Sequence, residues 1–172
     1  MALFDRLLGR KPEETNLRPL WHRVVEIARE PQWYATGGIA DSVPGRFDAI
    51  STVLSLVLLR MEASEAVRGE TARLTELFVA DMDGQLRESG VGDVIVGKYM
   101  GKMMSALGGR LVAFRAGLAQ PEALDQAIMR NIYRSETAEP AGLANVRHGL
   151  LELERSLAAT SPETIVAGSA TW

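Results

Sequence analysis

Apolar residues recur at three- and four-residue intervals along most of the chain, with polar residues between them. This spacing places the apolar side chains on one face of an α-helix, and it predicts six or seven helices in a single globular domain. The segments that show it begin at 20, at 46 or 47, and at 64, 93, 121 and 143, and they end at 30, 63, 88, 118, 133 and 158. No pair of strands is indicated, so the predicted fold class is all-α.

One of these helices is predicted at the centre of the domain. Residues 50–59 are apolar nearly all round, and a helix that is apolar on every side must be buried. The preceding residues, 33–45, contain Gly37-Gly38 and Pro44-Gly45, which favour turns. We therefore expect Trp33 and Tyr34 in a loop.

Three parts are expected along the chain. Residues 1–16 form an amphipathic segment with a linker, 17–159 form the helical domain, and 160–172 form a loose tail with weak patterning. Residues 1–10 carry Leu3, Phe4, Leu7 and Leu8 on one face of a short helix. That segment is a candidate for peripheral membrane contact; docking on a partner or packing on the domain itself are the alternatives.

The segment 81–110 is the least generic part of the sequence, because it ends one helix and starts the next at a specified corner. Gly90 stands where the end of a helix favours a left-handed residue, and Asp93 is placed to cap the following helix. That helix, 93–118, carries a bulky apolar seam typical of a core-facing surface: Val96, Met100, Met103, Leu107, Leu111, Phe114 and Leu118.

The same helix carries a small residue at every fourth position. We call this set the small-residue stripe: Gly97, Gly101, Ser105, Gly109, Ala113 and Gly117. Small residues let another helix backbone approach closely, and each Gly costs a helix about 0.5–1 kcal/mol relative to Ala. Each four-residue step overshoots one turn by about 40°, so the stripe winds around the helix and a straight partner can follow only part of it. An intramolecular neighbour is the simpler partner, and an external helix is the alternative.

Composition narrows the function classes. A net charge of −3 disfavours a general nucleic-acid binder, DNA included. The absence of cysteine excludes disulfides, zinc–thiolate sites and thiol nucleophiles. The longest uncharged apolar run, 49–59, is far shorter than the roughly 20 residues that span a bilayer. The N-terminus resembles neither a secretory signal nor a mitochondrial presequence, which predicts a bacterial, cytoplasmic protein that is soluble or peripheral to a membrane.

Candidate catalytic and metal sites fail on their spacing. Asp81 and Asp83 lack the third acidic ligand and the closing Glu of a calcium loop. Glu88 and Asp93 have no nucleophile, metal site or phosphate loop beside them, and helix ending and capping explain both. Neither histidine has a second histidine at helical spacing, so haem or metal ligation is not indicated. We therefore expect no catalytic residue, metal or cofactor, and a binding protein rather than an enzyme.

Two arginines, Arg46 and Arg110, lie beside glycines in apolar surroundings. If buried, each must be paired with a carboxylate, and those available are Asp48, Asp81, Asp83 and Asp93. We expect an internal ion network that fixes the corner at Gly90, in which Asp81 accepts a hydrogen bond from Arg46 or from a neighbouring helix. A charged rim around a binding groove is the alternative.

These residues also carry a resemblance to a known family. The sequence resembles the ubiquinol–cytochrome c chaperone family in Asp81-Met82-Asp83, Leu86-Arg87-Glu88, Gly90-Val91-Gly92-Asp93, Val96-Gly97-Lys98, Met103 and Gly109-Arg110, and upstream in Asp41 and Gly45-Arg46-Phe47-Asp48, more weakly in Ala28-Arg29, Pro31 and Tyr34. The resemblance covers roughly 20–118. Its polar positions form the candidate polar network: Asp41, Arg46, Asp48, Asp81, Asp83, Arg87, Glu88, Asp93, Lys98 and Arg110.

The resemblance implies an assembly chaperone for ubiquinol–cytochrome c reductase (complex III) that binds newly made cytochrome b near the ribosomal exit. An apolar client helix would lie along the helix 93–118, and the candidate contact residues are Gly97, Met100, Gly101, Met104, Ser105 and Gly108. Family members often have a bulky aromatic residue where this chain has Gly108, so a wider groove or a different client is expected. The alternatives are a ribosome- or RNA-associated factor without catalytic activity and, third, an enzyme acting on a lipid or quinone.

Overall fold

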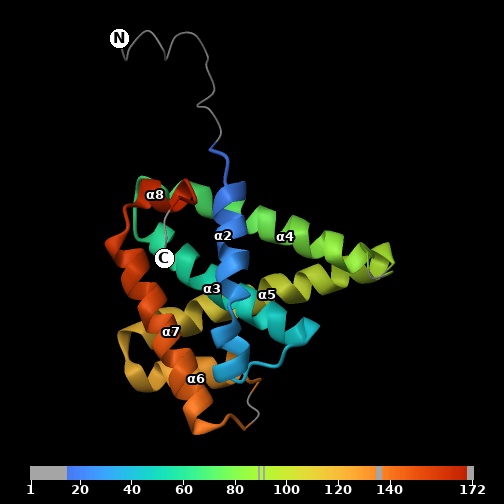
Figure 1. Cartoon of the computed structure of the whole chain (residues 1–172). Helices are drawn as coiled ribbons and strands as arrows, with labels where there is room; N and C mark the ends of the chain where they lie inside the picture. Colours follow the sequence, from blue (N-terminus) through green and yellow to red (C-terminus); the bar gives the residue numbers. More distant parts are fainter. Residues whose placement is uncertain (1–14, 89, 91, 135–136, 170–172) are drawn as a thin grey trace, which may run out of the picture.

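The computed structural model describes residues 15–88, 90, 92–134 and 137–169, and within them the chain forms seven α-helices and no strand. This confirms the all-α fold (Figure 1). The helices are α2 (Arg18–Ala28), α3 (Val43–Glu62), α4 (Thr71–Glu88), α5 (Asp93–Ala119), α6 (Pro121–Asn131), α7 (Pro140–Ala159) and α8 (Pro162–Val166). The membrane or partner contact predicted for residues 1–10 lies outside the described residues.

Helix α3 is the centre of the molecule, as its all-round apolarity predicted. It packs against α2, α5 and α7, and Leu54 and Val57 on it are fully buried. Two of its buried hydroxyls are satisfied within the helix, because Ser51 Oγ and Ser55 Oγ donate to the carbonyl oxygens four residues earlier, each at 2.7 Å. The helix begins at Val43, earlier than expected, because Ser42 Oγ accepts a hydrogen bond from Gly45 N at 3.3 Å and caps it.

Two segments differ from the predicted elements. Trp33 and Tyr34 lie in a single π-helical turn, Gln32–Thr36, rather than in a loop. Their polar atoms donate to carbonyls at the end of α2: Trp33 Nε1 to Ile27 O at 2.6 Å and Tyr34 Oη to Ala28 O at 2.7 Å. Residues 64–70 form turns and a 3₁₀ segment instead of the first turns of α4, where Gly69 would have weakened a helix.

The expected loose tail is wrong over residues 162–166, which form α8. Ser161 Oγ accepts from Thr164 N at 3.2 Å and caps this short helix, and Ile165 and Val166 are buried. Gly168 then approaches α2 so closely that an added Cβ would lie 2.5 Å from Leu20 N. A five-residue helix is too short to show a period, so only the packing reveals it.

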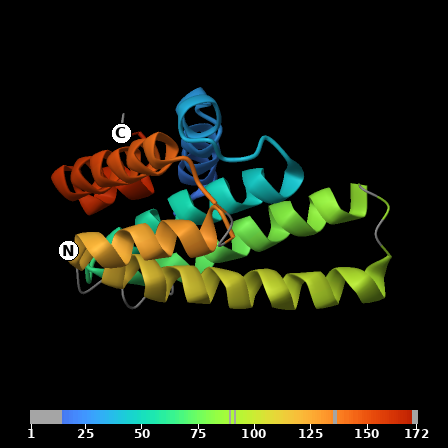
Figure 2. The ribbon, with the colours of Figure 1, turned by 90° about the horizontal axis from the view of Figure 1, so that it is seen from below.

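Helices α4 and α5 form a long antiparallel hairpin. Figures 1 and 2 show that their joined ends project beyond the other helices. The residue that ends the turn after α4, Gly90, has φ +80°, which confirms the predicted left-handed stop. The prediction for Asp93 needs correction, because Gly92 occupies the N-cap position and Asp93 is the first helical residue. No helix in the described part of the chain is long and apolar enough to cross a membrane.

Candidate functional site

Helix α5 presents two different surfaces, and one of them faces the protein. Val96, Leu107 and Phe114 of the predicted apolar seam are buried. The other members of the seam pack partly against the core: Met100, Met103, Leu111 and Leu118. The seam is therefore confirmed as the side of α5 that holds it to the rest of the molecule.

A second side, which we call the outer face of α5, consists of Gly97, Gly101, Met104, Ser105, Gly108 and Val112, all exposed. A Cβ added to any of its three glycines would have no neighbour within 4 Å. Met104 and Val112 are 40% and 66% exposed. Five of the six predicted contact residues thus share one open surface, whereas Met100 lies on the half-buried side and does not belong to it.

The small-residue stripe meets the protein only at its far end. A Cβ on Gly117 would lie 2.8 Å from the Leu124 Cα, so Gly117 permits the close packing of α5 on α6. Gly97, Gly101 and Gly109 have no such neighbour among the described residues. An intramolecular partner therefore accounts for Gly117, whereas no close contact in the described part of the chain accounts for the small size of Gly97, Gly101 and Gly109.

Arg110 is buried and paired, but not at the corner that the sequence suggested. Its guanidinium donates to the carboxylate of Asp48 on α3, and its Nη2 donates to Asn131 O at 3.0 Å. Asp48 also accepts from Arg134 Nε at 2.7 Å. Burial lowers the pKa of the Arg110 guanidinium, and the Asp48 charge opposes that shift. This ion cluster joins α3, α5 and the residues after α6; nothing in the sequence singled out Arg134.

The remaining members of the candidate polar network lie elsewhere. Arg46 Nε donates to Asp41 Oδ1 at 2.7 Å in an exposed pair, which lowers the pKa of Asp41 through that hydrogen bond. The exposed Asp81 accepts from Gln85 Nε2 at 3.1 Å and not from Arg46 as expected.

On α4, Asp83 accepts from Arg87 Nε at 2.6 Å, one turn apart on the same helix. Glu88 and Lys98 are exposed, and the side chain of Asp93 lies outside the described residues. The predicted single network at the corner is therefore wrong. The polar residues of the motif form separate pairs instead: Asp41 with Arg46, Asp83 with Arg87, and Asp48 with Arg110.

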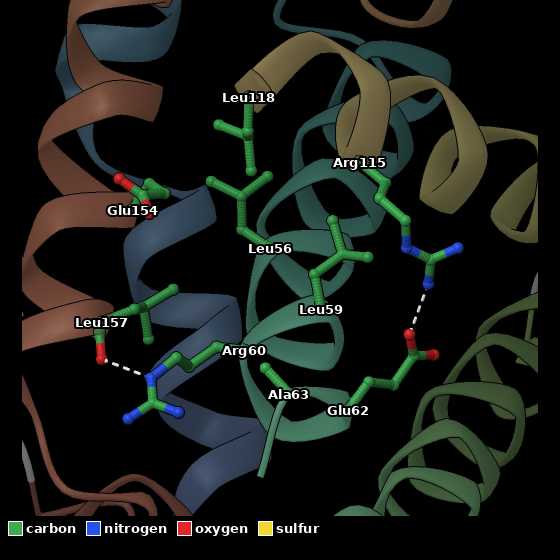
Figure 3. Close-up of a pocket in the computed structure, with 9 residues that line it drawn as sticks. All are labelled: Leu56, Leu59, Arg60, Glu62, Ala63, Arg115, Leu118, Glu154 and Leu157. Atoms are coloured by element: carbon green, nitrogen blue, oxygen red, sulfur yellow. Dashed lines mark hydrogen bonds and ion pairs between the residues drawn. The ribbon is translucent and has the colours of Figure 1, made fainter.

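A cavity of about 450 Å³ lies between α3, α5 and α7 (Figure 3). Its walls are leucines: Leu56, Leu59, Leu118 and Leu157. The arginines at its rim are engaged, because Arg60 Nε donates to Leu157 O at 2.9 Å and Arg115 pairs with Glu62. Such a cavity has the chemistry to accept an apolar group, and it lies away from the outer face of α5.

The described residues contain no cluster of three or more His, Asp or Glu side chains suited to a metal. His22 is exposed on α2, and His148 Nε2 lies 3.9 Å from Glu152 Oε1 on the surface of α7.

The sequence model of the ubiquinol-cytochrome C chaperone family matches residues 35–172. The chain belongs to this family. The match reaches the end of the chain, beyond the region 20–118 on which the resemblance rested. A solved structure, the Cbp3 homolog from Brucella abortus, is similar to this chaperone-family chain with 28% identity and a TM-score of 0.81, over 100% of this chain and 96% of that one. No individually curated protein matches the sequence. The alternative of a ribosome- or RNA-associated factor gains no support from these similarities.

Proposed function

We propose that this protein is an assembly chaperone for ubiquinol–cytochrome c reductase that holds an apolar helix of a newly made subunit, cytochrome b, on the outer face of α5. Membership of the family supports the role in assembly. The single observation that supports this site is a row of exposed glycines inside a long helix, at Gly97, Gly101 and Gly108.

Those glycines destabilise the isolated chain. Each costs α5 about 0.5–1 kcal/mol relative to Ala, and none is offset by a close contact among the described residues. A second helix lying along them would approach α5 at close range and gain dispersion contacts over its length. Met104 is flexible and polarisable, so it can adapt to side chains of different shape. Close approach of a partner helix would therefore offset the cost of these exposed glycines and explain why they stand in the helix.

The protein acts by binding, without making or breaking a covalent bond. Its client is a segment that would otherwise expose apolar side chains to water before it enters the membrane. We place this step in the cytoplasm, at the inner membrane and near the ribosomal exit, where such a segment first emerges. Release follows when the client helix packs against its own subunit partners.

The test is Gly101→Leu, which fills the centre of the outer face. Because a Cβ added to Gly101 would have no neighbour within 4 Å, the leucine has room and the protein should stay folded. Gly84→Leu on α4 is the matched control, since Gly84 is also helical and has no neighbour within 4 Å. Full-length variants carrying a photo-crosslinker at Val112 would be purified from cells that make complex III, and crosslinked peptides would be identified by mass spectrometry.

We expect cytochrome b peptides from the parent protein and from Gly84→Leu, and a loss of at least tenfold from Gly101→Leu. Circular dichroism melts would show that all three proteins are folded. Equal recovery of cytochrome b from Gly101→Leu and the parent protein would place the client elsewhere. Consistent recovery of a different subunit would replace cytochrome b as the client.

A further inference from the structure

A shallow hollow of about 380 Å³ lies between α5 and the end of α6, beside the outer face of α5. Its lining includes three cationic side chains and no carboxylate; the residues that matter are Lys102, Ser105, Gly109, Arg110, Arg130 and Asn131. Gly109 leaves it open, because an added Cβ there would have no neighbour within 4 Å. The hollow therefore combines room for a small group with positive charge on both sides.

Two of these cations have no acidic partner among the residues that the structure describes. Lys102 and Arg130 are exposed, and neither forms an ion pair with any residue that the structure describes. Lys102 Nζ lies over the ring of Tyr99, 5.9 Å from its centroid. A cation–π contact leaves the ammonium its charge and its hydrogen-bond donors, so both cations are available to an anion.

The third cation is built into the protein. Arg110 is 5% exposed, and its Nε is buried without a hydrogen-bond partner. Its carboxylate partner, Asp48, is shared with Arg134, so one negative charge faces two guanidinium groups. Arg110 therefore contributes a buried guanidinium to the lining of the hollow.

The sequence around the hollow strengthens that potential. Residues 94–121 contain no Asp or Glu, although the chain has 22 acidic residues in all. Two of the three lysines of the chain, Lys98 and Lys102, lie in this stretch. The local positive charge thus contrasts with the net charge of −3.

We propose that this hollow binds a phosphate group. Lys102 and Arg130 supply charge-assisted donors from its two sides, the Ser105 hydroxyl adds a neutral donor, and Arg110 supplies charge beneath. A phosphate has several acceptor oxygens and suits donors that converge from different helices. The inference does not depend on client binding, because Gly101→Leu leaves every residue of the hollow in place.

The competing explanation is local. Arg130 is in the last turn of α6, where a cation also interacts favourably with the helix carbonyls. The test must therefore separate a binding site from helix-end stabilisation and from general charge. We compare the parent protein with Lys102→Gln/Arg130→Gln. The matched control is Arg18→Gln/Arg29→Gln, which removes two exposed cations from the α2 region.

The first probe is inorganic phosphate, added to the ¹⁵N-labelled full chain at constant ionic strength. We expect saturable shifts of the amides of residues 102–110 and 130–131 in the parent and control, and binding weakened by roughly fivefold for each cation removed.

The second probe is flotation with phosphatidylcholine vesicles, with and without phosphatidylglycerol. Preference for the anionic vesicles that only the hollow variant loses identifies a lipid headgroup as the source; saturable phosphate shifts without that preference identify a soluble phosphate. The proposal is overturned if the amide shifts of the parent protein do not saturate with phosphate, or if the control variant loses as much binding as the hollow variant.

Discussion

Gly117 lies against the backbone of α6, where its missing side chain leaves 2.8 Å between an ideal Cβ position and the Leu124 Cα. A Cβ added to Gly101, on the same stripe, would have no neighbouring atom within 4 Å. We therefore expect Gly117→Ala to lower the free energy of unfolding by about 1–3 kcal/mol through overpacking. Gly101→Ala should raise it by about 0.5–1 kcal/mol through helix propensity. Urea denaturation of both variants measures these changes, and a shift of the same sign in both would contradict the assignment.

Removal of the Asp48 carboxylate, which pairs with Arg110, should lower the free energy of unfolding strongly. Asp48→Ala leaves the buried Arg110 guanidinium without its charge partner, which costs about 3–5 kcal/mol of the free energy of unfolding. The exposed pair Asp41–Arg46 is the control, since solvent screens it and Asp41→Ala should change stability far less. Chemical denaturation gives both values. Similar losses in the two variants would show that Arg110 finds another partner.

The protein should lose stability at high pH because of Tyr133. Burial raises the pKa of its phenol, whose hydroxyl donates to Gly37 O. The folded protein therefore keeps a proton that the unfolded chain releases near pH 10, so the stabilising contribution is complete below about pH 10 and disappears as the pH rises through the folded pKa. Burial raises the pKa of Tyr34 as well, so the two tyrosines share this loss.

Tyr133→Phe should cost about 0.5–1.5 kcal/mol at pH 7, the value of its hydrogen bond, and should reduce the decline of stability above pH 10. Thermal melts from pH 8 to 11 measure both effects. Tyr99→Phe is the control, because Tyr99 is 46% exposed. An unchanged alkaline decline in Tyr133→Phe would assign it to another group.

Because α8 buries Ile165 and Val166, we expect the C-terminal residues to stabilise the domain. Ile165 is fully buried, and Ile165→Ala should lower the free energy of unfolding by about 2–5 kcal/mol. Glu163→Ala, at an exposed position of the same helix, should have a small effect. Denaturant midpoints compare the two. If Ile165→Ala has no effect, the segment after 160 does not pack on α2 in solution.

The candidate site was predictable where it depends on one helix. The spacing of Val96, Leu107 and Phe114 predicted which side of α5 faces the core, and the same geometry placed Gly97, Gly101 and Met104 on a different face of the helix. The motif in the sequence could not show which carboxylate Arg110 meets. Asp48 lies 62 positions away along the chain, and that contact depends on how α5 crosses α3.

By itself, the sequence determined the helical class, the central position of α3, the stop at Gly90 and the two-sided character of α5, because local spacing and backbone preference decide these features. Only the tertiary structure decided that Gly117 packs while Gly101 is exposed, that Arg110 and Arg134 share Asp48, and that Ile165 is buried. The physical reason is that each of these depends on the distance between helices. That distance is set by the packing of many side chains at once, which no short stretch of sequence contains.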